Sequence, residues 1–419
     1  MQIRSIKVCL LFFVILLGCR SEDNLLINHS HLDYLYEEIE VDGTEMAIVH
    51  IYSDYPEYNF VGDDDEGFAC VDDAARAAVY YLRDWELSGE EKSIRKNKML
   101  LEFILYMQAE SGYFYNFIWD DYSINKEFKT SVAEPNWWSW RALWVLTESY
   151  GYYKSNDPEF AERVLNSIER LAEAIRDMIP AQYNYDTIAG VKLPAWLPYK
   201  YAADQAAVLL LGLAEYYKLN DDEEIYNYMK KLCYGIIEMQ LSESEFKGAF
   251  LSWQNNWHAW GNLQSYALLK VYPIFNDKKL LTAALSELDD FYPYLISNGY
   301  LNSFIVEEIE GELQITEKSG YSQIAYNIRP MVYALTEAHN ITGNKVYAKR
   351  ASSAAKWLSG SNPAGTAMYN PETGRVYDGI NSVDFINKNS GAESTIEGLL
   401  ALVKIKQTPA ASDYFLKND

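Results

Sequence analysis

Short motifs recur along this chain of 419 residues at steps of 54 to 68 residues, and each opens an apolar stretch. The six motifs occupy residues 71–76, 136–141, 201–205, 256–260, 321–326 and 389–394. A step of this size fits two helices and their two connections. After the first motif, apolar residues follow the 3-and-4 spacing of one helix face, at Ala74, Ala75, Ala78, Val79 and Leu82. The repeat therefore predicts six helical hairpins, which we expect to close into a ring.

The two helices of each predicted hairpin differ in character. The first is the more apolar or aromatic and the second the more charged, as expected for an inner ring wrapped by an outer one. The predicted pairs are a helix from the first motif with 91–108, 136–155 with 158–179, 201–219 with 222–240, 256–274 with 277–297, and 321–342 with 344–359. The last inner helix is 390–406, and residues 29–40 are its expected partner, which would close the ring head to tail.

The longer connections would all fall on one rim of this ring. They cover residues 109–135, 180–200, 298–320 and 360–389. Long loops on one face often carry function. Small β-elements are expected among the connections, including a strand at 46–52 and a hairpin at 300–315 that turns at Glu310-Gly311.

Two segments resemble motifs of uncharacterised toroid domains, some of which are fused to bacterial sugar transferases. They are residues 65–77 and 389–395. With the six hairpins, the chain resembles the six-hairpin glycosidase class over residues 45–406. The resemblance implies an all-α fold, the (α/α)6 toroid or barrel, with small β-elements in its rim loops. It also implies a glycoside hydrolase that acts on an oligo- or polysaccharide by carboxylate acid/base catalysis, with inversion as in most enzymes of this fold. The same fold carries polysaccharide lyases and sugar epimerases, so these stay open, as does a non-catalytic glycan-binding lipoprotein.

The first residues are typical of a targeting segment. Arg4 and Lys7 precede an apolar run, residues 8–17, that is too short for a bilayer span. The following Gly18-Cys19 resembles the cleavage site of a bacterial lipoprotein, with Cys19 as the lipidated residue. We therefore expect residues 1–18 to be a signal peptide, 19–44 a tether and N-terminal segment, and 407–419 a C-terminal tail. The implied location is the cell envelope, anchored to the outer membrane by lipid, and the acidic 21–23 stretch resembles an outward-sorting signal.

The charge and the Cys and His content of the chain limit which partners and metals we expect it to bind. The net charge of −24 disfavours nucleic acid and anionic membrane surfaces, and fits a neutral carbohydrate substrate. We expect a monomer that meets the membrane through its lipid anchor only. Cys70 and Cys233 are expected as buried thiols, and the few His and scattered Cys predict no metal site and no cofactor. A calcium site in the acidic run 63–66 is the weaker alternative, because the run lacks helix–loop–helix spacing.

Acidic residues at the predicted inner-helix starts are the candidate catalysts. Glycoside hydrolysis generally needs two carboxyl groups. Ring closure would bring Glu393 beside Asp72 and Asp73, so Glu393 is the leading acid, and Asp204 is a further candidate in an Ala-rich start. N-capping or interaction with the helix dipole is the structural alternative for these residues.

Polar and aromatic residues near the same starts are the candidate substrate-binding groups. We expect Trp137 and Trp257 as sugar platforms, although core packing explains most of the Trp residues. A structural role is the alternative for His258. The full predicted binding set is Glu66, Arg76, Trp137, Trp257, His258, Tyr326, Arg329 and Asn389.

Overall fold

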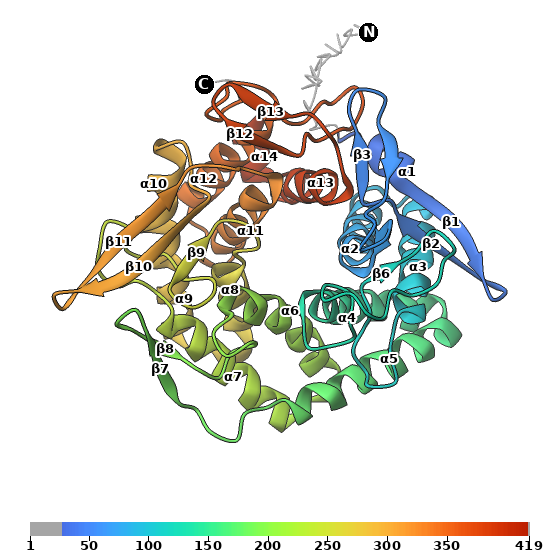
Figure 1. The fold of residues 1–419 in the computed structure, drawn as a ribbon, viewed down its shortest axis with the longest axis horizontal. Coiled ribbons are helices and arrows are strands. Elements are labelled where there is room, and N and C mark those ends of the chain that lie inside the picture. Colours follow the sequence, from blue (N-terminus) through green and yellow to red (C-terminus); the bar gives the residue numbers. More distant parts are fainter. Residues whose placement is uncertain (1–26, 418–419) are drawn as a thin grey trace, which may run out of the picture.

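The computed structural model describes residues 27–417. The predicted signal peptide, Cys19 and the first part of the tether lie outside these residues. Six helices form an inner layer (Figure 1): α2 (Val71–Ser88), α4 (Trp137–Asn156), α6 (Ala203–Asn220), α8 (Gln264–Phe275), α11 (Ala325–Thr342) and α13 (Ala392–Lys406). Each contacts the next in chain order and α13 contacts α2, so the series of contacts closes on itself.

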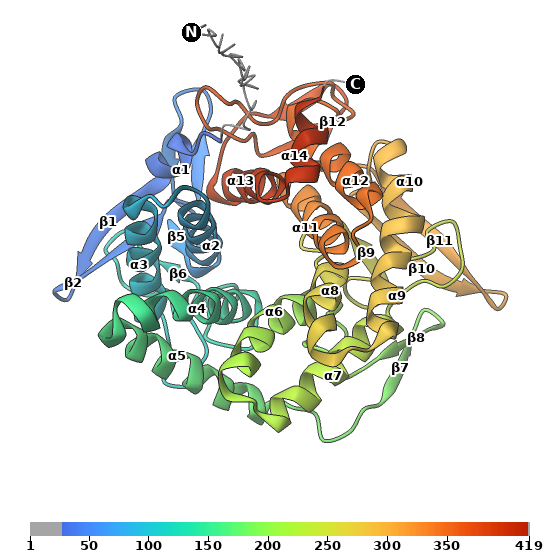
Figure 2. The same ribbon diagram turned by 180° about the vertical axis from the view of Figure 1, so that it is seen from behind.

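Outer helices surround this layer. They are α3 (Glu91–Tyr106), α5 (Pro158–Asp177), α7 (Glu223–Glu238), α9 (Lys278–Ser286) with its π-helical continuation Glu287–Phe291 and α10 (Tyr292–Ser297), α12 (Lys345–Ala355) with the 3-10 turn Lys356–Ser359, and α14 (Pro409–Leu416). Short polar breaks join each inner helix to its outer partner on the face seen in Figure 2. Asp157 shows why one such break works, because its carboxylate caps α5 by accepting the N–H of Phe160, and Pro158 begins that helix.

The last inner helix has a different partner from the expected one. The segment 29–40 contains only the short helix α1 (Ser30–Leu35), which contacts α13, and then continues as strand β1 (Tyr36–Val41). Within residues 407–419, expected as a tail, helix α14 packs against both α12 and α13. The chain ends therefore meet through contacts of α13 with α1, α2 and α14.

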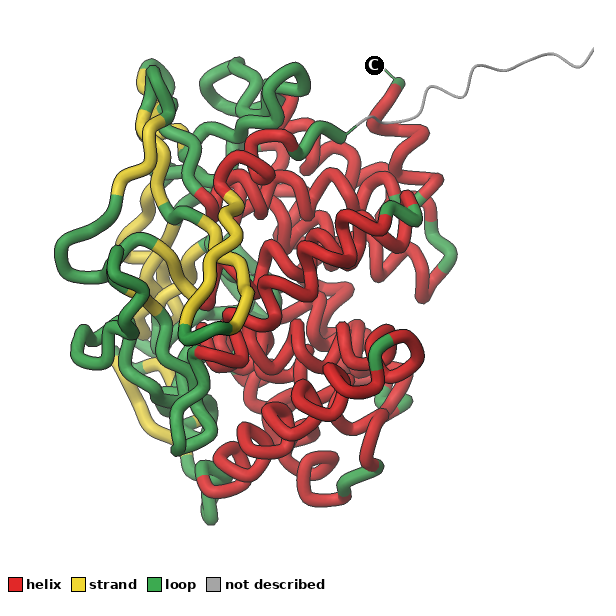
Figure 3. The backbone as a smooth tube through the Cα atoms, turned by 90° about the vertical axis from the view of Figure 1, so that its right-hand side faces the viewer, coloured by secondary structure: helices red, strands yellow, loops and turns green. Residues whose placement is uncertain are grey.

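Small antiparallel sheets and long loops gather on one side of the helices (Figure 3). β1 pairs with β2 (Thr44–Val49), and the predicted hairpin forms between β10 (Ser303–Ile309) and β11 (Glu312–Ser319). Positive φ angles at Glu310 and Gly311 make its tight turn. The other strands are β3 (Tyr52–Asp54), β4 (Asn59–Val61), β5 (Ala69–Cys70), β6 (Phe117–Ile118), β7 (Tyr185–Ile188), β8 (Val191–Pro194), β9 (Asn256–His258), β12 (Gly379–Ser382) and β13 (Phe385–Asn387).

The prediction of a helix over 256–274 is wrong in its first half. Residues 256–258 form β9, which pairs with β10, and α8 begins only at Gln264. Gly261 between them has a φ of +68°, and a Cβ there would lie 3.1 Å from the hydroxyl of Tyr326. The Trp residues at 253, 257 and 260 therefore do not share a helix face.

The interior is apolar and continuous across the inner helices. Cys70 and Cys233 are buried free thiols, as the sequence predicted. Among residues 27–417, no helix is both long and apolar enough to cross a membrane.

Candidate active site

Most of the predicted catalytic residues lie where the inner helices begin, on the loop-rich side seen in Figure 3. The start of α13 is fixed there by backbone hydrogen bonds, because Ser390 and Ala392 donate to the carbonyls of Ser53 and Ile51. A Cβ on Gly391 would lie 2.7 Å from the Ile51 carbonyl oxygen. The glycine of this motif therefore allows the close approach of α13 to Ile51, two residues before Glu393.

Arg76 joins the first and last inner helices. Its guanidinium lies 3.1 Å from a carboxylate oxygen of Asp73, 2.7 Å from Glu393 and 3.5 Å from Glu397. Asp73 and Glu393, which are 320 positions apart in the chain, thus lie near each other, as the sequence predicted, and share one cation. The Glu393 side chain keeps 42% of its surface exposed, whereas that of Asp73 keeps 7%.

Burial changes the protonation of two acids in this region. Burial raises the pKa of Asp73 to about 6, against the opposing charge of Arg76. Asp378, which sequence reasoning missed, accepts the Gly391 N–H at 2.8 Å. Burial raises the pKa of Asp378 to about 6 against this hydrogen bond, and the nearby Glu393 adds to the rise. Both carboxyls are therefore partly protonated near pH 6.

Arg141 of α4 connects Asp72 to Tyr326. It lies 2.5 Å from Asp72 and donates to the Tyr326 hydroxyl at 2.7 Å, and its guanidinium sits 5.0 Å from the ring centre of Trp137. The third arginine, Arg329, is 1% exposed and pairs through two nitrogens with Glu397. The polar groups of Tyr326 and Arg329 therefore bind other side chains of the protein, and both residues are buried, which does not fit the predicted contact with substrate.

A pocket of about 570 Å³ is connected to this charged centre through Trp137, which lines the pocket and contacts Arg141. Its aromatic lining comes from Trp137, Tyr199, Trp253 and Trp260, and Trp253 and Trp260 are 43% and 38% exposed. The Trp137 and Trp260 rings lie 5.9 Å apart. The remaining lining residues are Lys129, Thr130, Glu134, Asn136, Ala202, Asp204, Gln205, Asn256 and His258.

Two carboxyl groups face this pocket. Asp204 of α6 lies 3.0 Å from the Nε2 of His258. Glu134, in the loop before α4, accepts hydrogen bonds from the Tyr199 hydroxyl at 2.6 Å and the Asn136 amide at 3.0 Å. The sequence indicated Trp137, Asp204 and His258, but it gave no signal for Tyr199, which sits at a positive φ of 47° in an irregular loop.

The other predicted binding residues lie elsewhere. Trp257 is 2% exposed and stacks on Phe304 with ring centres 4.9 Å apart, so it packs in the core and does not line the 570 Å³ pocket. Glu66 accepts a hydrogen bond from Thr130 at 2.7 Å, at the edge of the same pocket. Asn389 uses its amide to hold the β3–β4 hairpin, through Asp54 and the Tyr55 N–H.

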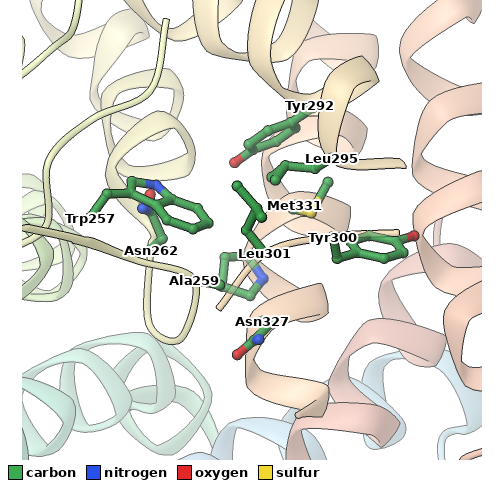
Figure 4. A pocket seen from close by; sticks show the side chains of 10 residues that line it. Trp257, Ala259, Asn262, Tyr292, Leu295, Tyr300, Leu301, Asn327 and Met331 are labelled. Atoms are coloured by element: carbon green, nitrogen blue, oxygen red, sulfur yellow. The ribbon is translucent and has the colours of Figure 1, made fainter. Parts of the chain in front are cut away.

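A second, smaller pocket has Trp257 among the side chains that line it (Figure 4). Its volume of about 10 Å³ matches a single water molecule, so no sugar fits there. Asn262 and Asn327 line it together with Tyr292 and Met331. This small cavity is distinct from the 570 Å³ aromatic pocket, which has room for a larger ligand.

The acidic run 63–66 folds into a turn. One Asp63 oxygen accepts the N–H groups of Asp65 and Glu66. In the described part of the chain, no group of three or more His, Cys, Asp or Glu side chains is arranged to hold a metal ion.

The fold is shared with carbohydrate-active enzymes. No protein-family model matches the chain, and no curated protein matches its sequence. A sugar epimerase from a ruminal bacterium aligns with a TM-score of 0.60 at 13% identity, over 86% of this chain and 92% of that one. A family 76 glycoside hydrolase from a bovine Bacteroides thetaiotaomicron strain gives 0.56 at 15% identity, over 92% and 77%. A polysaccharide lyase gives 0.52 at 12% identity, over 81% and 90%. Since these enzymes perform three different reactions, the likeness establishes the fold alone.

Proposed function

We propose that this chain is an (α/α)6 toroid glycoside hydrolase that cleaves a neutral oligo- or polysaccharide. The observation that carries the proposal is the 570 Å³ pocket, which combines three Trp side chains with two carboxyl groups. Aromatic faces pack on the apolar faces of sugar rings, and carboxyl groups supply the acid and base that glycoside cleavage needs. A pocket of this size is also in the usual range for small-molecule sites.

The charged centre, which Arg141 and Trp137 connect to the pocket, supplies further carboxylates. Because Arg76 contacts one oxygen of Asp73 and one of Glu393, these groups lie within roughly 8 Å of each other, a separation that carboxyl pairs of glycosidases span. Glu393 is the more exposed and fits a role at the substrate. Asp73 is nearly buried and fits a supporting role, with Asp72 and Asp204 as the other candidate acids.

The pairing of the arginines supports a neutral substrate over an acidic one. Arg76, Arg141 and Arg329 all neutralise carboxylates of the chain itself. A lyase acting on an acidic sugar would need a cation to hold the sugar carboxylate, and Lys129 is the one Lys or Arg that lines the pocket. This arrangement disfavours the lyase alternative.

A reducing-sugar assay over a panel of neutral glycans tests the proposal. We expect turnover by the intact protein and a loss of roughly 100-fold or more in kcat/KM for Glu393→Gln. Glu312→Gln, at an exposed position of strand β11 beside the hairpin turn, makes the same change of charge outside the pocket lining and serves as the matched control. Full activity of the Glu393 variant would remove Glu393 from the mechanism.

Product analysis in the same assay separates the alternatives. A sugar of changed configuration without bond cleavage would indicate an epimerase, and a product absorbing in the ultraviolet would indicate a lyase. Glycan binding without turnover by the intact protein would indicate a non-catalytic binding protein.

The cellular placement is part of the proposal. Cys19 is proposed to carry lipid and to anchor a monomeric enzyme to the outer membrane. Incorporation of labelled fatty acid into the intact chain, lost in Cys19→Ser, is the expected result. Labelling that survives this substitution would contradict the anchor.

A further inference from the structure

Asp204 and His258 come from different segments and are fixed against each other. Asp204 is in the first turn of α6 and His258 ends β9, and both are more than 90% buried. The segment between them is tied down, because the Ser252 carbonyl accepts the N–H groups of Ala203 and Asp204, and the Ser252 hydroxyl accepts the N–H of His258. The Nε2–Oδ2 distance of 3.0 Å is therefore set by backbone contacts on both sides.

The surroundings of the His258 ring determine where its protons lie. Nδ1 is 2.9 Å from the carbonyl oxygen of Trp260, which can only accept, so Nδ1 carries a hydrogen. Nε2 faces the Asp204 carboxyl, whose other oxygen already accepts the Gln205 N–H at 2.6 Å. One further proton is then shared between Nε2 and Oδ2, as imidazole with carboxylic acid or as imidazolium with carboxylate.

This shared proton lies in the wall of the aromatic pocket. His258 stacks on Trp260 with ring centres 3.8 Å apart and planes 9° from parallel, which holds the imidazole ring in place. Asp204, His258 and Trp260 all line the 570 Å³ pocket. The other titratable groups that line it are Lys129, Glu134 and Tyr199.

We propose that the Asp204–His258 pair is the proton donor of the site, an assignment that rests on the proposed hydrolase function. Asp204 is the catalytic residue, and His258 is a positioning residue that keeps the proton on the pair. As the glycosidic C–O bond breaks, its electron pair passes to the leaving oxygen, and the shared proton moves from Asp204 to that oxygen. A water molecule adds to the sugar carbon and gives up its proton to a second carboxylate, and solvent returns a proton to the pair.

The dependence on the leaving group tests this role. A 2,4-dinitrophenyl group departs without protonation, whereas a phenyl group needs an acid. With phenyl and 2,4-dinitrophenyl glycosides of glucose, mannose and galactose as probes, Asp204→Asn should lower kcat/KM by roughly 100-fold or more on the phenyl glycoside. On the dinitrophenyl glycoside of the same sugar the loss should stay below about tenfold. His258→Gln should show the same difference between the two glycosides.

His339→Gln is the matched control, because this half-buried histidine of α11 lies outside the pocket lining and also places Nδ1 near a carbonyl oxygen, that of Asn344. It should leave both rates unchanged. Equal losses on both glycosides for Asp204→Asn would assign the residue to binding or structure and overturn the donor role alone.

A spectroscopic measurement keeps this inference distinct from the hydrolase proposal. In the protein labelled with 15N-histidine, the signals that disappear in His258→Gln belong to His258. We expect a protonated Nδ1, and an Nε2 signal that shifts in Asp204→Asn. An unprotonated Nδ1, or an Nε2 signal indifferent to Asp204, would overturn the pair whatever the enzyme cleaves. If the spectrum is as expected but the protein hydrolyses none of the glycans or aryl glycosides, the hydrolase function is overturned, and the donor role with it.

Discussion

Glu287 carries a free-energy cost that depends on pH. This residue begins the π-helical segment after α9, its side chain has no exposed surface, and no ion pair is found for it within residues 27–417. It accepts hydrogen bonds from the Ser265 hydroxyl at 2.6 Å and the Phe250 N–H at 3.4 Å. Burial raises the pKa of Glu287 from 4.5 to about 7, against these two hydrogen bonds and a third from the Tyr292 side chain.

The sign and size of the effect follow from this shift. Because the pKa is higher in the folded state, the folded protein binds the proton more tightly than the unfolded chain does. The contribution of Glu287 to stability is complete below pH 4.5 and is lost as the pH rises to about 7. A shift of this size corresponds to about 3 kcal/mol in the free energy of unfolding. Glu287→Gln removes the titration, so the variant should gain about 3 kcal/mol relative to wild type between pH 4.5 and pH 8.

Urea unfolding at several pH values measures this difference. Fluorescence and circular dichroism should be followed together, because coincident transitions are needed for a two-state free energy in a chain of this length. The diagnostic quantity is how the difference in unfolding free energy between Glu287→Gln and wild type changes with pH. Any cost of fitting an amide next to Ser265 is the same at every pH and does not affect this change. Glu312→Gln, at an exposed position of β11, should show no such change. A difference between Glu287→Gln and wild type that stays constant from pH 4.5 to pH 8 would refute the reasoning.

Two further predictions concern the inner helices. Gly212→Ala in α6 should destabilise the fold by about 1–3 kcal/mol, because the new Cβ would lie 2.6 Å from a Leu143 carbon on α4. Gly151→Ala in α4 has open space around the new Cβ and should stabilise the fold by about 0.5–1 kcal/mol. If the two substitutions changed the unfolding free energy in urea equally, the packing between α4 and α6 would be contradicted. Arg329→Met should cost about 3 kcal/mol, because the buried Glu397 carboxylate would lose its two-nitrogen partner and keep the more distant Arg76, at 3.5 Å. An unfolding midpoint equal to that of wild type would contradict the pair of Arg329 with Glu397.

Periodicity predicted the helical hairpins closely, because it records a local property. The helices predicted at 136–155 and 158–179 are observed as α4 and α5 within about two residues at each end. The same reasoning failed at 256–263, which was predicted as helix. Residues 256–258 instead form β9 and pair with β10, a strand about 45 residues further along the chain. A partner that distant leaves no trace in the local pattern.

The candidate site, too, was predictable only in part. Ring closure, inferred from the repeat, was enough to predict that Glu393 would come near Asp73. It could not predict that Arg76 would bridge them, or that Asp378 would lie beside Glu393. Sequence reasoning also expected Trp257 at the sugar, whereas Trp253 and Trp260 line the pocket and Trp257 packs in the core.

The sequence by itself determined the order and the inner or outer character of the helices in the first five hairpins, the place of the last inner helix, and the concentration of acidic and aromatic residues where the inner helices begin. Each of these follows from residues close together in the chain, whose spacing selects a helix and the face it buries. Only the tertiary structure decided the pairings: Arg329 with Glu397, Asp204 with His258, and the loops that wall the pocket. The physical reason is that charge pairing and cavity shape depend on distances between segments far apart in the chain, which the closed arrangement of helices sets and local spacing does not.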